Sequence, residues 1–259
     1  MRILVSNDDG YDSEGLQELV RALSRRHEVY VSAPLTQRSA ASHSVTYFRQ
    51  KNLARRVEIS GASEAWAIDG TPADCVYYAI HGFMKDRRPD AVISGINYGR
   101  NMSSDCIYSG TVAAAGEGMI YGIPSMAVSL CDDHAEDFTC AAKAACDLLD
   151  VLVNDPDAGS YIMNVNVPAV PAEEIKGYRV TELDTKADYG KEIFFLEQED
   201  GDYLLEVINK PPRSASPQMK ENGDITAVRN GYISVTPLYY DLCAHQYKNQ
   251  LKPAEDIEF

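Results

Sequence analysis

Two adjacent aspartates, Asp8 and Asp9, follow a short apolar run at the start of the chain. The run, residues 3–5, has the composition of a buried strand, and Gly10 after the two acids marks a turn. In an open parallel sheet, ligands bind outside the carboxyl ends of the strands, where this pair would stand. Neighbouring carboxylates repel each other unless a positive charge lies between them, so the pair predicts a divalent cation with oxygen ligands, Mg²⁺ or Mn²⁺. A solvated Asp-Asp-Gly turn is the alternative.

A polar segment of small side chains, residues 35–44, follows the second predicted strand. It leaves the sheet at the edge where Asp8 and Asp9 stand, so we expect a lid or a ligand-binding loop. Ser39 would offer a hydroxyl oxygen to the cation, and His43, one of five histidines, would serve as a substrate contact or proton donor. An ordinary loop with His43 exposed on the surface is the alternative.

A third polar cluster, residues 95–101, follows a strand predicted at 90–94. Asn97 carries an amide oxygen that suits a hard cation, and the neighbouring Gly95 and Gly99 let the backbone approach a ligand closely. Asparagine beside glycine is also ordinary turn chemistry. The cluster therefore supports a cation site only because it is predicted at the same sheet edge as the aspartates.

A fourth cluster, Ser109, Gly110 and Thr111, precedes an alanine-rich run and marks the start of a helix. The first turn of a helix has unpaired N–H groups and a partial positive charge, which suit a phosphoryl group. Ordinary helix capping is the alternative interpretation. Independent turns do not require four polar clusters at one sheet edge, however, and together they favour a site for a cation and a phosphate.

Regular alternation of strands and helices over residues 1–168 predicts an α/β core with a mostly parallel sheet. The predicted strands are 3–6, 28–33, 90–94, 125–130 and 161–167, with short β-like pieces at 45–48, 57–60 and 65–68. The predicted helices are about 13–26, 71–83, 111–120 and 135–153. The first turn lacks a glycine-rich dinucleotide motif, which argues against an NAD-binding protein.

Beyond residue 168 the pattern changes, so we divide the chain into a catalytic core, 1–168, and a C-terminal extension, 169–259. The extension has a strand at 178–183, a hairpin at about 192–209, a short helix at 224–230, a strand returning to the core at 232–236, and a tail. A two-stranded hairpin is marginally stable alone. We therefore expect it to pack against another subunit, with strand exchange, in a homodimer or homotetramer.

The composition limits the classes of function. A net charge of -15 argues against a nucleic-acid-binding protein, since that function relies on basic patches. No apolar run is long enough for a membrane span or a signal peptide, so we expect a cytoplasmic protein with no membrane partner. The six cysteines form no C-x-x-C pair and are interpreted as reduced and structural.

Taken in order, these motifs resemble the SurE (survival protein E) family of nucleotidases. The matching segments are 3–10, Ser39 with 41–44, 70–75, 94–101, 108–112, 164–168 and 231–237. The resemblance implies a metal-dependent phosphomonoesterase that acts on nucleoside 5′- and 3′-monophosphates and on short-chain polyphosphate. It also implies a Rossmann-like, three-layer α/β core and a dimer or tetramer with exchanged C-terminal elements. One departure concerns substrate preference: the family's acidic, asparagine-rich loop opening reads Leu-Thr-Gln-Arg at 35–38, with Ala40 in place of glycine.

The match assigns Asp8, Asp9, Ser39 and Asn97 as ligands of one divalent cation per subunit. Our hypothesis for the reaction is attack on the phosphorus by water that the metal activates, with Asp8 and Asp9 as the catalytic residues and Asp9 as the base for the water. The phosphate and substrate would be oriented by Asn101, Ser109, Gly110, Thr111 and His43.

Two other functions remain open. A phosphatase of the haloacid-dehalogenase type uses an aspartate nucleophile with a second aspartate two residues later, where this chain has Gly10. The second alternative is a nonenzymatic module that binds a nucleotide without releasing phosphate.

Overall fold

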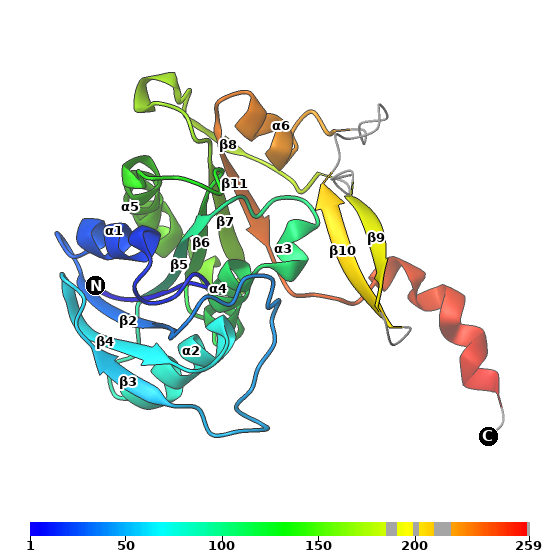
Figure 1. The fold of residues 1–259 in the computed structure, drawn as a ribbon, viewed down its shortest axis with the longest axis horizontal. Coiled ribbons are helices and arrows are strands. Elements are labelled where there is room, and N and C mark those ends of the chain that lie inside the picture. Colours follow the sequence, from blue (N-terminus) through cyan, green and yellow to red (C-terminus); the bar gives the residue numbers. More distant parts are fainter. Residues whose placement is uncertain (185–190, 199–201, 210–218, 258–259) are drawn as a thin grey trace.

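A nine-stranded sheet runs through the molecule (Figure 1), in the strand order β3-β4-β2-β1-β5-β6-β7-β11-β8. The computed structural model describes residues 1–184, 191–198, 202–209 and 219–257. The strands of this sheet are β1 (Arg2–Ser6), β2 (Glu28–Pro34), β3 (Ala54–Val57), β4 (Ala62–Ile68), β5 (Ala91–Tyr98), β6 (Ser125–Leu130), β7 (Ile162–Val167), β8 (Tyr178–Val180) and β11 (Ile233–Leu238). The strands from β4 to β7 in this order run parallel, while β3 and β11 are antiparallel to β4 and β7. The predicted mostly parallel sheet is confirmed.

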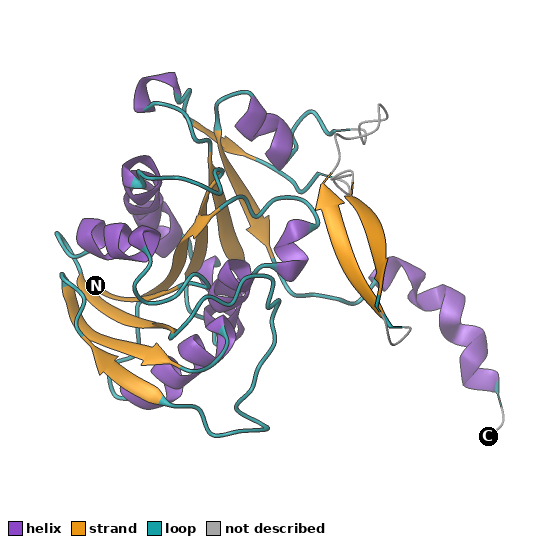
Figure 2. Ribbon diagram, in the orientation of Figure 1, coloured by secondary structure: helices purple, strands orange, loops and turns teal. Residues whose placement is uncertain are grey.

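Helices cover both faces of the sheet (Figure 2). One face is packed by α1 (Glu14–Leu23) and α5 (Thr139–Asn154), and the other by α2 (Pro72–Tyr78) and α4 (Gly110–Ile120). Shorter turns complete the core: η1 (Ala79–Phe83), α3 (Asp105–Tyr108), η2 (Ala158–Ser160) and η3 (Ala172–Glu174). This arrangement is the expected three-layer α/β core.

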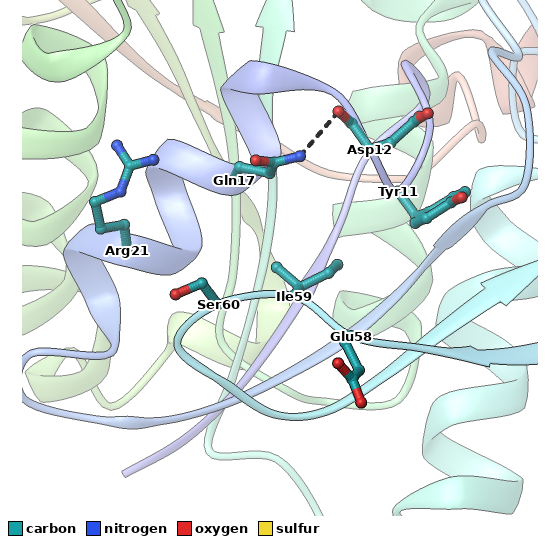
Figure 3. A pocket seen from close by; sticks show the side chains of 7 residues that line it. All are labelled: Tyr11, Asp12, Gln17, Arg21, Glu58, Ile59 and Ser60. Atoms are coloured by element: carbon teal, nitrogen blue, oxygen red, sulfur yellow. Dashed lines mark hydrogen bonds between the residues drawn. The ribbon is translucent and has the colours of Figure 1, made fainter.

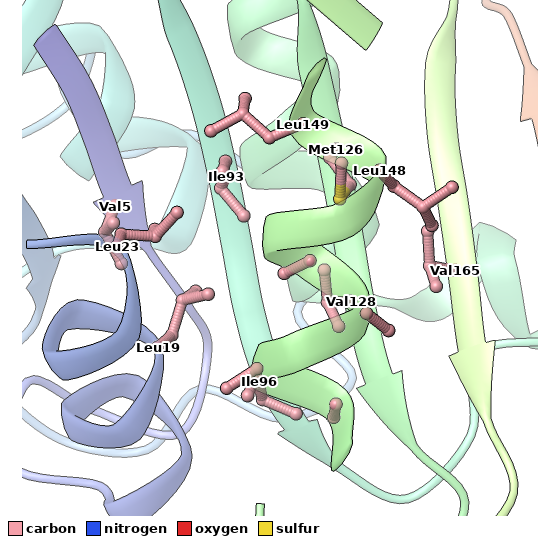
Figure 4. Close-up of a cluster of buried hydrophobic side chains, with 14 of the residues drawn as sticks. Val5, Leu19, Leu23, Ile93, Ile96, Met126, Val128, Leu148, Leu149 and Val165 are labelled. Carbon is pink, nitrogen blue, oxygen red and sulfur yellow. The ribbon is translucent and has the colours of Figure 1, made fainter. Parts of the chain in front are cut away.

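The larger apolar core lies between the sheet and the α1–α5 layer (Figure 4). Leu19 and Leu23 of α1 and Leu149 of α5 meet Val5 and Ile93 of the central strands, and all five are fully buried. Burying side chains of this size stabilises the fold by about 1.5–3 kcal/mol each. The centre of the sheet is therefore a rigid support for the residues at its edge.

The two helices of the opposite layer begin as their sequences predict. Thr71 caps α2 with a reciprocal pair of hydrogen bonds to Asp74, and Pro72 occupies the first turn. Ser109 caps α4 by accepting a hydrogen bond from the Val112 N–H at 3.1 Å. Both helix starts lie at the carboxyl edge of the parallel strands, which is where the polar clusters were expected.

Three strand predictions differ from the structure. Residues 45–48 form no strand because the Thr46 N–H donates to the Asp74 carboxylate at 2.9 Å, which leaves it unavailable for a sheet ladder. The edge piece predicted at 57–60 lies earlier, at β3. The strand predicted at 90–94 continues through Tyr98, because the pairing of β5 with β6 shifts register between Ser94 and Asn97.

The C-terminal segment makes a separate hairpin and then rejoins the sheet. Strands β9 (Lys191–Glu197) and β10 (Tyr203–Asn209) pair with each other, as predicted, and among the described residues with no other strand. The turn predicted at 199–202 lies largely outside the described residues. Helix α6 (Asp224–Arg229) leads into β11, which inserts between β7 and β8. The predicted tail contains a helical segment, η4 (His245–Asp256), that projects from the core in Figure 1. The division of the chain at residue 168 stays a prediction.

In the part of the chain that the structure describes, no helix combines the length and the apolar character needed to cross a bilayer. All six cysteines are unpaired.

Candidate functional site

The turn after β1 is held in shape by Asn7. The Asn7 side chain donates to the Gly10 carbonyl at 2.9 Å and to the Ser13 hydroxyl at 2.8 Å, and it accepts from the Gly10 N–H at 3.2 Å. Gly10 has φ of 110°, a conformation that favours glycine. These hydrogen bonds within the turn fix the positions of Asp8 and Asp9 after the end of β1.

Asp8 faces the start of helix α4. The Thr111 hydroxyl donates to Asp8 Oδ1 at 2.5 Å, and the backbone N–H groups of Gly110 and Thr111 also interact with this carboxylate. Asp8 is 4% exposed. Burial raises the pKa of Asp8 above its ordinary value, although these hydrogen bonds act in the opposite direction. The helix start therefore contacts Asp8 directly.

Asp9 accepts two longer hydrogen bonds, from the Tyr98 N–H at 3.3 Å and from the Gln37 side chain at 3.5 Å. Burial, and secondly the negative charge of Asp8, raise the pKa of Asp9 to about 7. Within the described chain, no lysine or arginine forms an ion pair with either aspartate. The two acids thus form an anionic pair that lacks a protein cation.

Ser39 shares a hydrogen-bond donor with Asp9, and Asn97 directly precedes Tyr98, whose N–H binds Asp9. Gln37 Nε2 donates to the Ser39 hydroxyl at 2.9 Å as well as to Asp9, so one amide group joins the two predicted ligands. Asn97 donates its Nδ2 to the carbonyls of Tyr98 and Gly99 at 2.9 and 2.8 Å, and its Oδ1 accepts no hydrogen bond from any described residue. Two carboxylates, a hydroxyl and a free amide oxygen are a donor set that fits Mg²⁺ or Mn²⁺.

Only two of the four proposed ligands, Asp8 and Asp9, are acidic side chains; the other two are a hydroxyl and an amide. Over the residues that the structure describes, no group of three or more His, Cys, Asp and Glu side chains is arranged to hold a metal ion. A site rich in thiolate or imidazole, as zinc prefers, is therefore not formed by these residues.

The fourth cluster lies at the helix start as predicted, but its hydroxyls are already engaged. Ser109 accepts from Val112 and Thr111 donates to Asp8, so capping and support of Asp8 are the roles that the geometry shows. Orientation of a phosphate by Ser109, Gly110 and Thr111 stays a prediction.

Asn101 is 6% exposed and belongs to a buried network of asparagines. Its N–H donates to Asn166 Oδ1 at 2.8 Å, and its side chain donates to Ser129 at 2.9 Å. The Asn101 carbonyl accepts from Asn164 and Asn166 of β7 at 2.9 and 3.0 Å. These bonds tie the loop after β5 to the sheet, and contact of Asn101 with substrate stays a prediction.

His43 has both ring nitrogens engaged. Nε2 lies 2.8 Å from Glu117 of α4, and Nδ1 lies 3.2 Å from the Tyr240 hydroxyl. The ring therefore contacts α4 and the segment after β11, and its predicted contact with substrate stays untested.

The family model described as "Survival protein SurE" matches residues 3–189. The chain belongs to the SurE family. It is similar to "5'-nucleotidase SurE" of Haemophilus influenzae (strain PittGG), with 44% identity over 100% of this chain and 99% of the relative. It is also similar to "5'/3'-nucleotidase SurE" of Proteus mirabilis (strain HI4320), with 39% identity over 97% of this chain and 95% of the relative.

A solved structure shows the same fold. The crystal structure of the SurE protein from Aquifex aeolicus superposes with a TM-score of 0.85 and 36% identity, over 99% of this chain and 100% of the other. The family resemblance found in the sequence motifs is thereby confirmed.

Three residues that support the SurE-type site were missed as functional residues in the sequence. Gln37 joins Asp9 to Ser39, Asp74 binds the Thr46 backbone of the same loop, and Glu117 binds His43. A signal existed for Glu117, since an acid within an alanine-rich apolar helix needs a partner. No comparable signal marks Gln37, because its position depends on the fold of the loop.

A pocket of about 200 Å³ lies between α1 and the turn that joins β3 to β4 (Figure 3). Tyr11 and Asp12, which directly follow the Asp8–Gly10 turn, line it together with Gln17, and the Gln17 side chain donates to the Asp12 carbonyl at 3.1 Å. Its lining includes none of the residues predicted for the site.

Proposed function

We propose that this SurE-family chain is a divalent-metal-dependent phosphomonoesterase that hydrolyses nucleoside 5′- and 3′-monophosphates to nucleoside and phosphate. The observation that carries the proposal is the Asp8–Asp9 pair beside the start of α4: Asp8 is buried, Asp9 is partly buried, and no lysine or arginine of the described residues forms an ion pair with either. Its relatives named as 5'-nucleotidases, aligned over nearly the whole chain, support nucleotides as substrates.

One Mg²⁺ or Mn²⁺ per subunit would be held by Asp8, Asp9, Ser39 and Asn97. Bound there, the cation would offset the charge of the phosphoryl group and lower the pKa of a water ligand. The sizes of the electrostatic interactions show why a cation is needed beside the two aspartates. A helix start contributes about 0.3–1 kcal/mol, or about 2 kcal/mol when partly buried. Two unit charges 4 Å apart interact by about 4 kcal/mol at an effective dielectric near 20, so the helix alone does not offset two aspartates.

The protein's own groups have separate tasks in this mechanism. Asp9 would accept the proton of the attacking water. Thr111 holds the Asp8 carboxylate in one orientation through its hydroxyl. Asn101 and the Ser109–Thr111 segment would orient the phosphate, with His43 nearer the rest of the substrate.

The test is phosphate release from nucleoside monophosphates by wild type, Asp9→Asn and Asp12→Asn, each with added Mg²⁺ or Mn²⁺ and with chelator. Asp12→Asn is the matched control, because it is the same chemical change at an exposed neighbour. We expect Asp9→Asn to abolish turnover and weaken metal binding, and chelator to stop the wild type. Full activity of Asp9→Asn with added metal would overturn the assignment. A trapped aspartyl-phosphate would favour the haloacid-dehalogenase type, and binding without release would favour a nonenzymatic module.

The hairpin supports a second part of the proposal, that the chain works as a homodimer or homotetramer. Adjacent residues of a strand point to opposite faces, yet Leu204 and Leu205 of β10 are 59% and 64% exposed. An apolar hairpin uncovered on both faces is typical of a subunit interface. Light scattering should give a multiple of the subunit mass, and Leu205→Glu should reduce the measured mass.

Short-chain polyphosphate as a second substrate and the cytoplasm as the location stay predictions.

A further inference from the structure

Three segments that lie far apart in the sequence meet at His43. The ring lies between Glu117 of α4 and Tyr240, which follows β11, at 2.8 and 3.2 Å. The rings of His43 and Tyr240 also pack edge to face, with centroids 5.3 Å apart. With its proton on Nε2, the ring donates to Glu117 and accepts from the Tyr240 hydroxyl, so His43 joins the two other segments.

Helix α4 is shaped to receive Tyr240. A Cβ on Gly116 would lie 2.2 Å from the Tyr240 hydroxyl oxygen and 2.5 Å from the ring. Glycine in the middle of a helix is less favourable than alanine, so its presence calls for a local reason. The close approach of the Tyr240 ring supplies that reason. The segment after β11 is thus seated on the backbone of α4.

The loop that His43 belongs to also presents Ser39. Its backbone is anchored on one side by the Arg38 N–H, which donates to the Asp8 carbonyl at 2.7 Å, and on the other by Ser42, which binds Tyr108 at 2.9 Å. Between these anchors Ala40 has φ of 56°, and Ser42 itself has φ of 53°. Left-handed conformations of residues with a Cβ persist only where surrounding contacts hold them. Ser39 therefore keeps its position through contacts that other segments make with the loop.

We propose that Tyr240 is a positioning residue for the site: seated on Gly116, it holds His43 against Glu117 and so fixes the loop that brings Ser39 to Asp9. The proposal rests on the proposed function, since Ser39 is there a ligand of the cation. It means that the segment after β11 must be docked on α4 for the ligand set to be complete. Tyr240 acts through His43, without touching the reacting atoms.

The test measures the Mn²⁺ dissociation constant of the full-length protein by titration calorimetry, beside KM and kcat for a nucleoside monophosphate. Gly116→Ala adds a methyl group that helix propensity favours but that collides with Tyr240. Tyr240→Phe keeps the ring and removes the hydrogen bond to His43. Gly82→Ala is the matched control, because nothing lies within 4 Å of a Cβ at that helical glycine.

We expect Gly116→Ala to weaken Mn²⁺ binding about tenfold or more, because the displaced Tyr240 releases the Ser39 loop. Tyr240→Phe should weaken it about threefold to tenfold, the range of one hydrogen bond. The same glycine change made in a Tyr240→Ala background should have no added effect, since its target is gone. Unfolding in urea, followed for each variant, identifies any variant that fails to fold. If Gly116→Ala is among them, the Mn²⁺ affinity and KM of Tyr240→Phe alone test the inference.

Wild-type Mn²⁺ affinity and KM in folded Gly116→Ala and Tyr240→Phe would overturn the inference and leave the proposed function standing. An equal loss in Gly82→Ala, or a further loss on adding Gly116→Ala to Tyr240→Ala, would also overturn it. Failure of the wild type itself to bind Mn²⁺ or release phosphate would instead refute the proposed function, and the inference with it.

Discussion

Replacing Gly110 with alanine should damage catalysis while leaving the fold in place. A Cβ at this position would lie 2.7 Å from the Asp8 Cβ, 2.9 Å from Asp8 Oδ2 and 3.0 Å from Pro72 Cγ. Non-bonded carbons sit at about 3.5–4.0 Å, so either Asp8 or the helix start must move by about 1 Å. A misplacement of about 1 Å at a reacting centre can cost about 100-fold in rate, which is about 2.7 kcal/mol of transition-state stabilisation.

The assay is the initial rate of phosphate release from a nucleoside 5′-monophosphate with saturating Mg²⁺, beside thermal unfolding followed by circular dichroism. Overpacking costs about 1–3 kcal/mol of stability, partly offset by the better helix propensity of alanine, so the variant should remain folded. Gly82→Ala is again the control, since its new methyl group meets no atom within 4 Å. If folded Gly110→Ala keeps a wild-type kcat/KM, the start of α4 does not set the position of Asp8 for the reaction.

Three further predictions each concern one residue. Thr111→Val removes the hydroxyl that binds Asp8, and kcat/KM should fall about tenfold or more, the value of a hydrogen bond to a charged group. Ala40→Gly relieves a left-handed backbone at φ of 56°, and the free energy of unfolding in urea should rise by about 0.5 kcal/mol, with a decrease contradicting the reasoning. Burial lowers the pKa of His27 below its ordinary 6.5, and its buried Nδ1 has no hydrogen-bond partner in the described chain. Protonation then favours the unfolded state, so stability should fall below about pH 6.5, and less steeply in His27→Gln.

The core was predictable because local pattern and tertiary packing agree there. The strands β1 and β2 are apolar runs that the sheet buries on both faces, and α1 buries the leucines that its 3.6-residue period places on one side. The starts of α2 and α4 were predictable from Thr71 and Ser109, since capping is a local interaction.

The rest depends on contacts that a sequence pattern does not contain. Asn97 lies inside β5 because the register shift after Ser94 lets the strand continue past a glycine. Residues 45–48 have β propensity, but the buried carboxylate of Asp74 binds their backbone instead. His43 was interpreted from its loop alone, whereas one of its partners, Tyr240, lies 197 positions away.

The place of β11 has a consequence for how the chain is made. In the described chain, β8 pairs with β11 and with no other strand, and β11 alone joins β8 to β7. Until the ribosome has added Ile233 and the residues after it, β8 has no neighbouring strand to pair with. A chain truncated just before Ile233 would lack β11, the second strand from this edge of the sheet. The edge strand β8 would then have no strand to pair with.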